Sequence, residues 1–121
     1  LRMVARALAE HPDPAVAIVA ALHDVVEDSA ISFDDLRVDG FSECIVDAVE
    51  ALTRRNGEAY GAFLLRARAN DLARIVKRLD VEDNLDPDRL ARIPSAAERF
   101  RLADKYAKAL RTLAEEAGHA G

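Results

Sequence analysis

The sequence predicts an all-α protein that folds as one compact domain. Apolar residues recur with a period near 3.6 along most of the chain, which is the spacing of one face of an α-helix. No stretch shows the alternation of apolar and polar residues that is typical of a half-buried strand. Half of the 121 residues are hydrophobic and 32% are charged, a normal balance for a globular protein. We therefore expect a single domain over residues 1–121, built from about five to seven helices.

Proline residues separate the first two expected helices. Residues 1–10 have the pattern of a helix, and two prolines within the next four positions end it. The second helix is expected over residues 13–28, where Asp13 suits the N-cap and Pro14 the first turn. Its buried stripe runs through Val19 and continues at His23, four residues further on.

Two serine residues mark the starts of the next helices. Ser32 is expected to cap a short helical turn that Gly40 ends. Ser42 begins a longer helix with an apolar stripe, and the single cysteine on that stripe, Cys44, is expected to be inert core. The stripe consists of Phe41, Cys44, Ile45, Ala48, Val49 and Leu52.

The second half of the chain is expected to add two long helices and a shorter one. One helix ends near Asn70, and Asp71 caps the helix that follows. The Asp-Pro-Asp sequence that begins at Asp86 ends this second helix. A short turn around Leu90 comes next, and Pro94 opens the last helix.

Composition excludes several classes of function. The net charge of −5 argues against nonspecific nucleic-acid binding by the whole chain. The longest wholly apolar run, residues 15–22, is far too short to span a membrane, and no targeting segment is visible. One cysteine cannot form an internal disulfide, which fits a reducing, cytoplasmic compartment. The oligomeric state stays open, with a homo-oligomer among the alternatives.

Charged residues are unevenly distributed along the chain. Residues 23–50 hold nine acids and one base, whereas residues 54–78 hold seven bases and two acids. An acidic segment beside a basic one suits a cation together with an anionic ligand. The alternative is a set of ordinary solvated helix faces that form salt bridges with one another.

Two expected core helices end in polar clusters. In the first, His23 continues an apolar stripe and is followed by Asp24, Glu27 and Asp28. A buried helix face that becomes acidic needs ion pairing, hydrogen bonding or a cation to offset the desolvation of its charges. In the second, the stripe Leu72, Ile75, Val76 and Leu79 runs into Glu82, Asp83 and Asp86, and Lys77, Asp80 and Asn84 lie along one side of the same helix.

Oxygen donors combined with one imidazole suit a divalent cation such as Mn²⁺ or Mg²⁺, and less obviously Zn²⁺. The remaining carboxylates, Glu27 and Asp28, could then orient or deprotonate the attacking water. The alternative is that these acids only cap exposed helix ends, in which case the chain is a plain helical interaction domain.

Three segments resemble the HD-domain metal-dependent phosphohydrolases, in the branch related to the hydrolase domain of the RelA/SpoT alarmone enzymes. Residues 21–28, Ala-Leu-His-Asp-Val-Val-Glu-Asp, resemble the family's "LLHDVVED" segment. Residues 76–85, Val-Lys-Arg-Leu-Asp-Val-Glu-Asp-Asn-Leu, are similar to its "VKLAD…N" segment, with Arg-Leu in place of Leu-Ala. Between them, residues 51–55 resemble the "VTK" turn. The resemblance covers nearly the whole chain and implies a compact HD-domain helical bundle.

The resemblance implies a metal site and its ligands. His23, Asp24 and Asp80 match the family's metal ligands, with Mn²⁺ the expected ion and Mg²⁺ or another divalent ion as alternatives. The family's first ligand is a histidine in a segment "HPLRVA" whose continuation resembles Leu1-Arg2-Met3-Val4-Ala5. We therefore expect this histidine two positions before Leu1, and the N-terminal helix that carries it, outside the given sequence.

The resemblance also implies catalytic and substrate-binding residues. Glu27 and Asp28 match the acidic pair that activates or orients the attacking water. Asn84 matches a residue that helps to hold the substrate or the site. Lys77 is a candidate phosphate contact, with a salt bridge to Asp80 or Asp83 as an equal alternative.

These implications define the expected function. The chain is expected to be an enzyme, a metal-dependent phosphohydrolase acting on a nucleotide phosphate or pyrophosphate ester. The most specific candidate reaction is hydrolysis of the 3′-pyrophosphate of (p)ppGpp. The alternative is a non-catalytic HD-fold module that binds a nucleotide or a metal.

Overall fold

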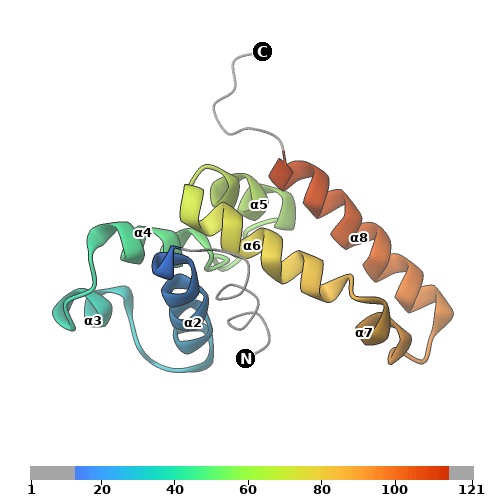
Figure 1. The fold of residues 1–121 in the computed structure, drawn as a ribbon, viewed down its shortest axis with the longest axis horizontal. Helices are drawn as coiled ribbons and strands as arrows, with labels where there is room; N and C mark the ends of the chain where they lie inside the picture. Colours follow the sequence, from blue (N-terminus) through green and yellow to red (C-terminus); the bar gives the residue numbers. More distant parts are fainter. Residues whose placement is uncertain (1–12, 115–121) are drawn as a thin grey trace, which may run out of the picture.

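The computed structural model of the protein describes residues 13–114, and every regular element in that part of the chain is a helix (Figure 1). The all-α prediction is therefore confirmed. The expected helix over residues 1–10 lies outside the described residues. The helices are α2 (Pro14–Asp28), α3 (Phe33–Val38), α4 (Glu43–Ala51), α5 (Tyr60–Arg68), α6 (Asp71–Asn84), α7 (Pro87–Ala91) and α8 (Ala96–Ala114). Among residues 13–114, no helix has both the length and the apolar character needed to cross a membrane.

Polar side chains cap the helix starts largely as the sequence predicts. Asp13 accepts a hydrogen bond from the Ala15 amide at 2.9 Å and so caps α2. Ser32 forms a reciprocal capping box with Asp35 at the start of α3. Ser42 caps α4 in the same manner, by accepting a hydrogen bond from the backbone of the first turn. These three starts are confirmed.

One predicted cap is wrong by a single residue. Asn70, not Asp71, caps α6, because the Asn70 side-chain oxygen accepts a hydrogen bond from the Ala73 amide at 3.0 Å. Asp71 is the first helical residue instead, where its negative charge lies at the positive end of the helix dipole. Both side chains suit a helix start, so their order could not be settled from residue type alone.

The interpretation of Cys44 as inert core is also wrong, because its side chain is exposed. The buried side of α4 is formed by Val46, Ala48 and Val49. Cys44 lies in the first turn of α4. The other residues of the predicted stripe are buried or partly buried, so the helical spacing identified the correct face but not whether a neighbouring element covers its first turn.

Helix α6 is the central element of the fold. It packs against α2 and α4 on one side of Figure 1 and against α5 and α8 on the other. Its residues Val76 and Leu79 belong to a core cluster shared with α2, α3 and α4, whereas Val81 belongs to a second cluster with Leu64 and Leu113. Asp80 therefore lies on α6 at the junction between the two clusters.

Candidate functional site

A cleft of about 320 Å³ is lined by residues from α2, α5, α6 and α8 and from the end of α4 and the segment after it. Its lining contains two kinds of side chain. The first kind is the acidic group, His23, Asp24, Glu27 and Asp80. The second is the basic–aromatic group, Arg54, Tyr60, Phe63, Lys77, Lys105 and Tyr106. One cleft thus presents ligands for a cation and for an anion.

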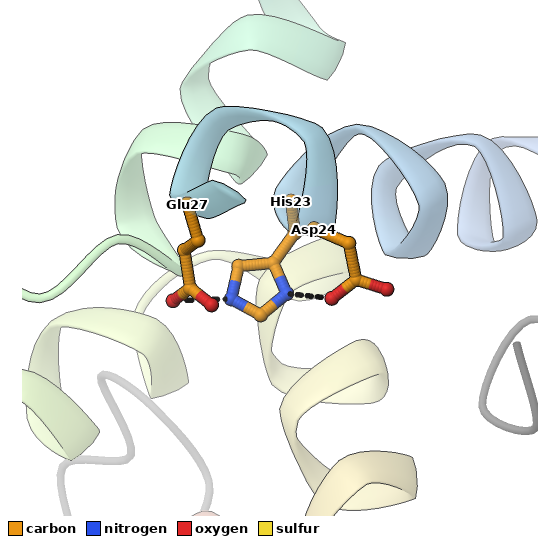
Figure 2. Close-up of side chains that lie close together, drawn as sticks. All are labelled: His23, Asp24 and Glu27. Carbon is orange, nitrogen blue, oxygen red and sulfur yellow. Dashed lines mark hydrogen bonds and ion pairs between the residues drawn. The ribbon is translucent and has the colours of Figure 1, made fainter. Parts of the chain in front are cut away.

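Three members of the acidic group come from one helix. Figure 2 shows the imidazole of His23 between the carboxylates of Asp24 and Glu27 on α2. Its Nε2 lies 2.9 Å from Oε1 of Glu27, and its Nδ1 lies 3.7 Å from Oδ1 of Asp24. The His23 side chain is 11% exposed, against 38% for Asp24 and 47% for Glu27. The ring is therefore held at the base of the group, and the two carboxylates reach solvent.

The hydrogen bonding of His23 provides a test of whether a metal ion fits these residues. A carboxylate only accepts hydrogen bonds, so a neutral imidazole bonded to Glu27 carries its proton on Nε2. Nδ1 is then a buried lone pair with no hydrogen-bond donor, 3.7 Å from a carboxylate oxygen. Two acceptors facing each other favour a cation between them. One ligand atom from each of His23, Asp24 and Glu27 lies within 4.8 Å of the others, so these donors fit a divalent ion.

The end of α2 is electrostatically unfavourable on its own. Asp24, Glu27 and Asp28 lie near its carboxyl end, and no basic residue lies in its last turn. The helix dipole places partial negative charge at this end, so each carboxylate in the last turn, Glu27 and Asp28, costs about 0.3–1 kcal/mol. The last turn of α6 also lacks a basic residue. A bound cation would offset this repulsion.

Asp80 lines the same cleft but does not belong to the three-residue cluster on α2. Its Oδ2 lies 3.0 Å from Nζ of Lys77, and the two side chains are 31% and 13% exposed. Asn84 also lines the cleft and donates a hydrogen bond to the main-chain oxygen of Asp80 at 3.0 Å. One cleft is thus lined by residues from both clusters singled out in the sequence. Glu82, Asp83 and Asp86 of the second cluster are not among its lining residues, and Asp83 is buried and pairs with Arg89 instead.

Asp28 is the one candidate site residue that the structure does not bring to the cleft. It is exposed and lies outside the lining. It follows Glu27 directly, and one residue along a helix turns the side chain by about 100°. Adjacent carboxylates on a helix therefore face different directions, and Glu27 faces the cleft.

Arg54, Tyr60 and Lys105 line the cleft, but they are not among the site residues predicted from the sequence. The Lys105 ammonium lies 4.4 Å from the centre of the Tyr60 ring, and the Arg54 guanidinium carbon lies 5.7 Å from it. The excess of bases over residues 54–78 was a partial signal for Arg54. The sequence contains no such signal for Lys105, because a lysine on a long amphipathic helix normally faces solvent.

Tyr60 places an unusual polar group in the cleft. Its hydroxyl is buried and has no hydrogen-bond partner in the described part of the chain. Burial raises the pKa of this phenol, and the proximity of Tyr106 and Asp80 raises it further, while Arg54 acts in the opposite direction. The hydroxyl therefore stays protonated at neutral pH and can donate a hydrogen bond to a ligand.

A partly buried ion pair holds the segment that carries Arg54. Arg66 on α5 binds both carboxylate oxygens of Glu58, at 2.8 and 2.9 Å, and also donates to the main-chain oxygens of Glu50 and Thr53. The hydrogen bonds from Arg66 and from the backbone of Arg55 lower the pKa of Glu58 to about 2. Arg54 in turn donates to the main-chain oxygen of Glu58 at 2.8 Å. The pair thus fixes the chain between α4 and α5.

Comparison with known proteins adds no assignment to this site. No protein-family model matches the chain, and a search of curated proteins finds no match either. The residues of the cleft and the sequence motifs are therefore the features that indicate a function.

Proposed function

We propose that the protein is a metal-dependent phosphohydrolase of the HD-domain type that acts on a nucleotide phosphate or pyrophosphate ester. The most specific candidate substrate is (p)ppGpp, hydrolysed at its 3′-pyrophosphate. The observation that carries the proposal is the cleft itself, in which the acidic end of α2, Asp80 of α6 and three cationic side chains line one cavity. A cytoplasmic location belongs to the same proposal.

In this proposal His23, Asp24 and Asp80 hold the divalent ion, with Mn²⁺ first and Mg²⁺ as the alternative. The ion supplies charge stabilisation at a phosphoryl oxygen and lowers the pKa of water. These three residues offer one imidazole nitrogen and carboxylate oxygens, which are the ligand atoms that bind such ions in proteins. The buried, unpartnered Nδ1 of His23 supports this assignment.

The side chains around the ion perform the remaining steps. Glu27 accepts the proton of the attacking water, since its partly exposed carboxylate lies in the cleft beside His23. The water oxygen forms the new bond to phosphorus as the ester bond to the leaving group breaks. Lys77 contacts the phosphate, and Asn84 steadies α6 through its hydrogen bond to Asp80.

The test is hydrolysis by the purified chain with Mn²⁺ and a panel of nucleotides that includes ppGpp. Wild-type protein should release phosphate or pyrophosphate, and Asp24→Asn should lower the rate by about 100-fold or more. Asp104→Asn is the matched control, because Asp104 is an exposed carboxylate that pairs with Lys108 away from the cleft. Absence of release from every nucleotide would overturn the enzymatic proposal, whereas release from other nucleotides but not from ppGpp would overturn only the alarmone substrate.

A non-catalytic nucleotide- or metal-binding module is the second candidate. It is favoured by two contacts that occupy proposed functional groups, the hydrogen bond between His23 and Glu27 and the ion pair between Lys77 and Asp80. Such a module predicts that Mn²⁺ and nucleotide raise the melting temperature without turnover. Thermal unfolding measured beside the hydrolysis assay separates the two candidates.

A further inference from the structure

The sequence motifs assign no function to the residues that line the cleft on α5, on α8 and in the segment after α4. We propose that Arg54, Tyr60 and Lys105 form a subsite for one doubly charged phosphoryl group. The inference deepens the proposed function and rests on it, because it takes the acidic group to hold a divalent cation. It names the substrate class as phosphate monoesters, including terminal phosphates, in preference to diesters.

Two of the three cationic side chains that line the cleft have no carboxylate counter-ion among the described residues. Among residues 13–114, neither Arg54 nor Lys105 forms an ion pair with a carboxylate, whereas Lys77 pairs with Asp80 and Lys108 pairs with Asp104. Lys105 instead lies over the rings of Tyr60 and Tyr106, at 4.4 and 5.5 Å from their centres. Such contacts hold an ammonium in place and leave its charge available to an anion.

The Tyr60 hydroxyl is a hydrogen-bond donor that the subsite can offer to a phosphoryl oxygen. It is buried, has no hydrogen-bond partner among the described residues, and belongs to a ring beneath both of these cations. A buried hydroxyl without a partner costs free energy unless a ligand supplies the acceptor. A phosphoryl oxygen is such an acceptor, and it would also meet the positive charges of Arg54 and Lys105.

The charge balance of the cleft favours a dianion once a divalent cation is bound. Its ionised lining consists of Asp24, Glu27 and Asp80 against Arg54, Lys77 and Lys105, so the charges cancel when His23 is neutral. A divalent cation leaves an excess of two positive charges. A phosphate monoester, which carries a charge of about −2 near neutral pH, restores the balance, whereas a diester carries only one negative charge. Cation and phosphate should therefore each strengthen the binding of the other.

The test measures binding without turnover. Phenylphosphonate is the probe, because it has a dianionic headgroup at pH 8 and a phosphorus–carbon bond in place of the ester bond that is hydrolysed. Its monomethyl ester is the matched monoanion. Titration calorimetry with Mg²⁺ should show the dianion binding about tenfold more tightly than the monoanion, and removal of Mg²⁺ should weaken the binding of the dianion.

Two substitutions test whether phenylphosphonate binds at the proposed subsite. Lys105→Gln should weaken phenylphosphonate binding by about tenfold, and Tyr60→Phe by about fivefold. Lys108→Gln should leave it unchanged, because Lys108 lies on the same helix but pairs with Asp104 outside the cleft. Circular dichroism checks that each variant is folded, and Lys105→Gln decides the test if Tyr60→Phe is not folded. Equal binding by Lys105→Gln and Lys108→Gln, or equal affinity for dianion and monoanion, would overturn the subsite.

The nucleotide hydrolysis assay separates this inference from the proposed function. Lys105-dependent binding of phenylphosphonate without any turnover would support the subsite and contradict the hydrolase. Turnover together with binding that does not depend on Lys105 would overturn the subsite and leave the hydrolase standing.

Discussion

The imidazole of His23 lies buried between two carboxylates, and its two ring nitrogens differ in their hydrogen bonding. Nε2 is satisfied by Glu27 at 2.9 Å, whereas Nδ1 has no donor. The local part of this arrangement could be predicted from the sequence, because residues one and four positions apart lie near each other on a helix. The contribution of Tyr60 and Lys105 could not, because it depends on how α5 and α8 pack against α6.

Asp28 gives a residue-scale prediction. It is an exposed carboxylate at the end of α2, outside the cleft, where the helix dipole is unfavourable. Asp28→Asn should therefore raise the free energy of unfolding by about 0.3–1 kcal/mol at low ionic strength. Urea denaturation measures this change, and the gain should shrink in high salt. A destabilised variant would contradict the electrostatic account of this helix end.

At the scale of elements, the segment between α4 and α5 shows how the fold positions a functional side chain. Its conformation depends on the pair of Glu58 and Arg66 rather than on regular hydrogen bonding. The sequence shows an excess of bases from Arg54 onward, but it does not indicate that Glu58 pairs with the residue eight positions further on, because no helical periodicity relates the two positions. Arg54 reaches the cleft as a consequence of this pair.

The Glu58–Arg66 pair gives an element-scale prediction of pH dependence. The pKa of Glu58 is about 2 in the folded protein, below its ordinary value of 4.5. A depressed carboxyl pKa stabilises the fold fully above the unfolded value, and this stabilisation is lost as the pH falls through the folded value. Glu58→Gln should therefore be less stable than wild type at pH 7, and the difference should shrink between pH 4.5 and pH 2.

Denaturation of both proteins across this pH range is the measurement. Glu43→Gln is a suitable control, because Glu43 pairs with Arg37 on an exposed face. A difference between wild type and Glu58→Gln that does not change with pH would contradict the role assigned to the ionised carboxylate.

At the scale of the whole molecule, α6 joins two core clusters and carries Asp80 between them. The all-α class and most helix starts could be predicted, because caps and apolar periodicity are local signals. The division of the core could not be predicted, since the apolar residues of α6 give no indication of which neighbouring helix each will contact. The same limit explains why Cys44 was assigned to the core.

Leu79 tests the importance of this central helix. It is fully buried in the first cluster, so Leu79→Ala should reduce the free energy of unfolding by about 2–5 kcal/mol. Leu65→Ala on α5 is the matched control, because Leu65 is 50% exposed and its loss should cost less than about 1 kcal/mol. Guanidinium denaturation compares the two variants. Equal costs would contradict the assignment of α6 as the shared core element.

The central claim is that the acidic ends of α2 and α6 bind one divalent cation together. Calorimetric titration of the chain with Mn²⁺, for wild type, Asp24→Asn and Asp80→Asn, tests it most directly. We predict one bound ion per chain, with the affinity reduced about tenfold or more by either substitution. No binding by the wild-type chain, or binding that Asp80→Asn leaves unchanged, would contradict the claim.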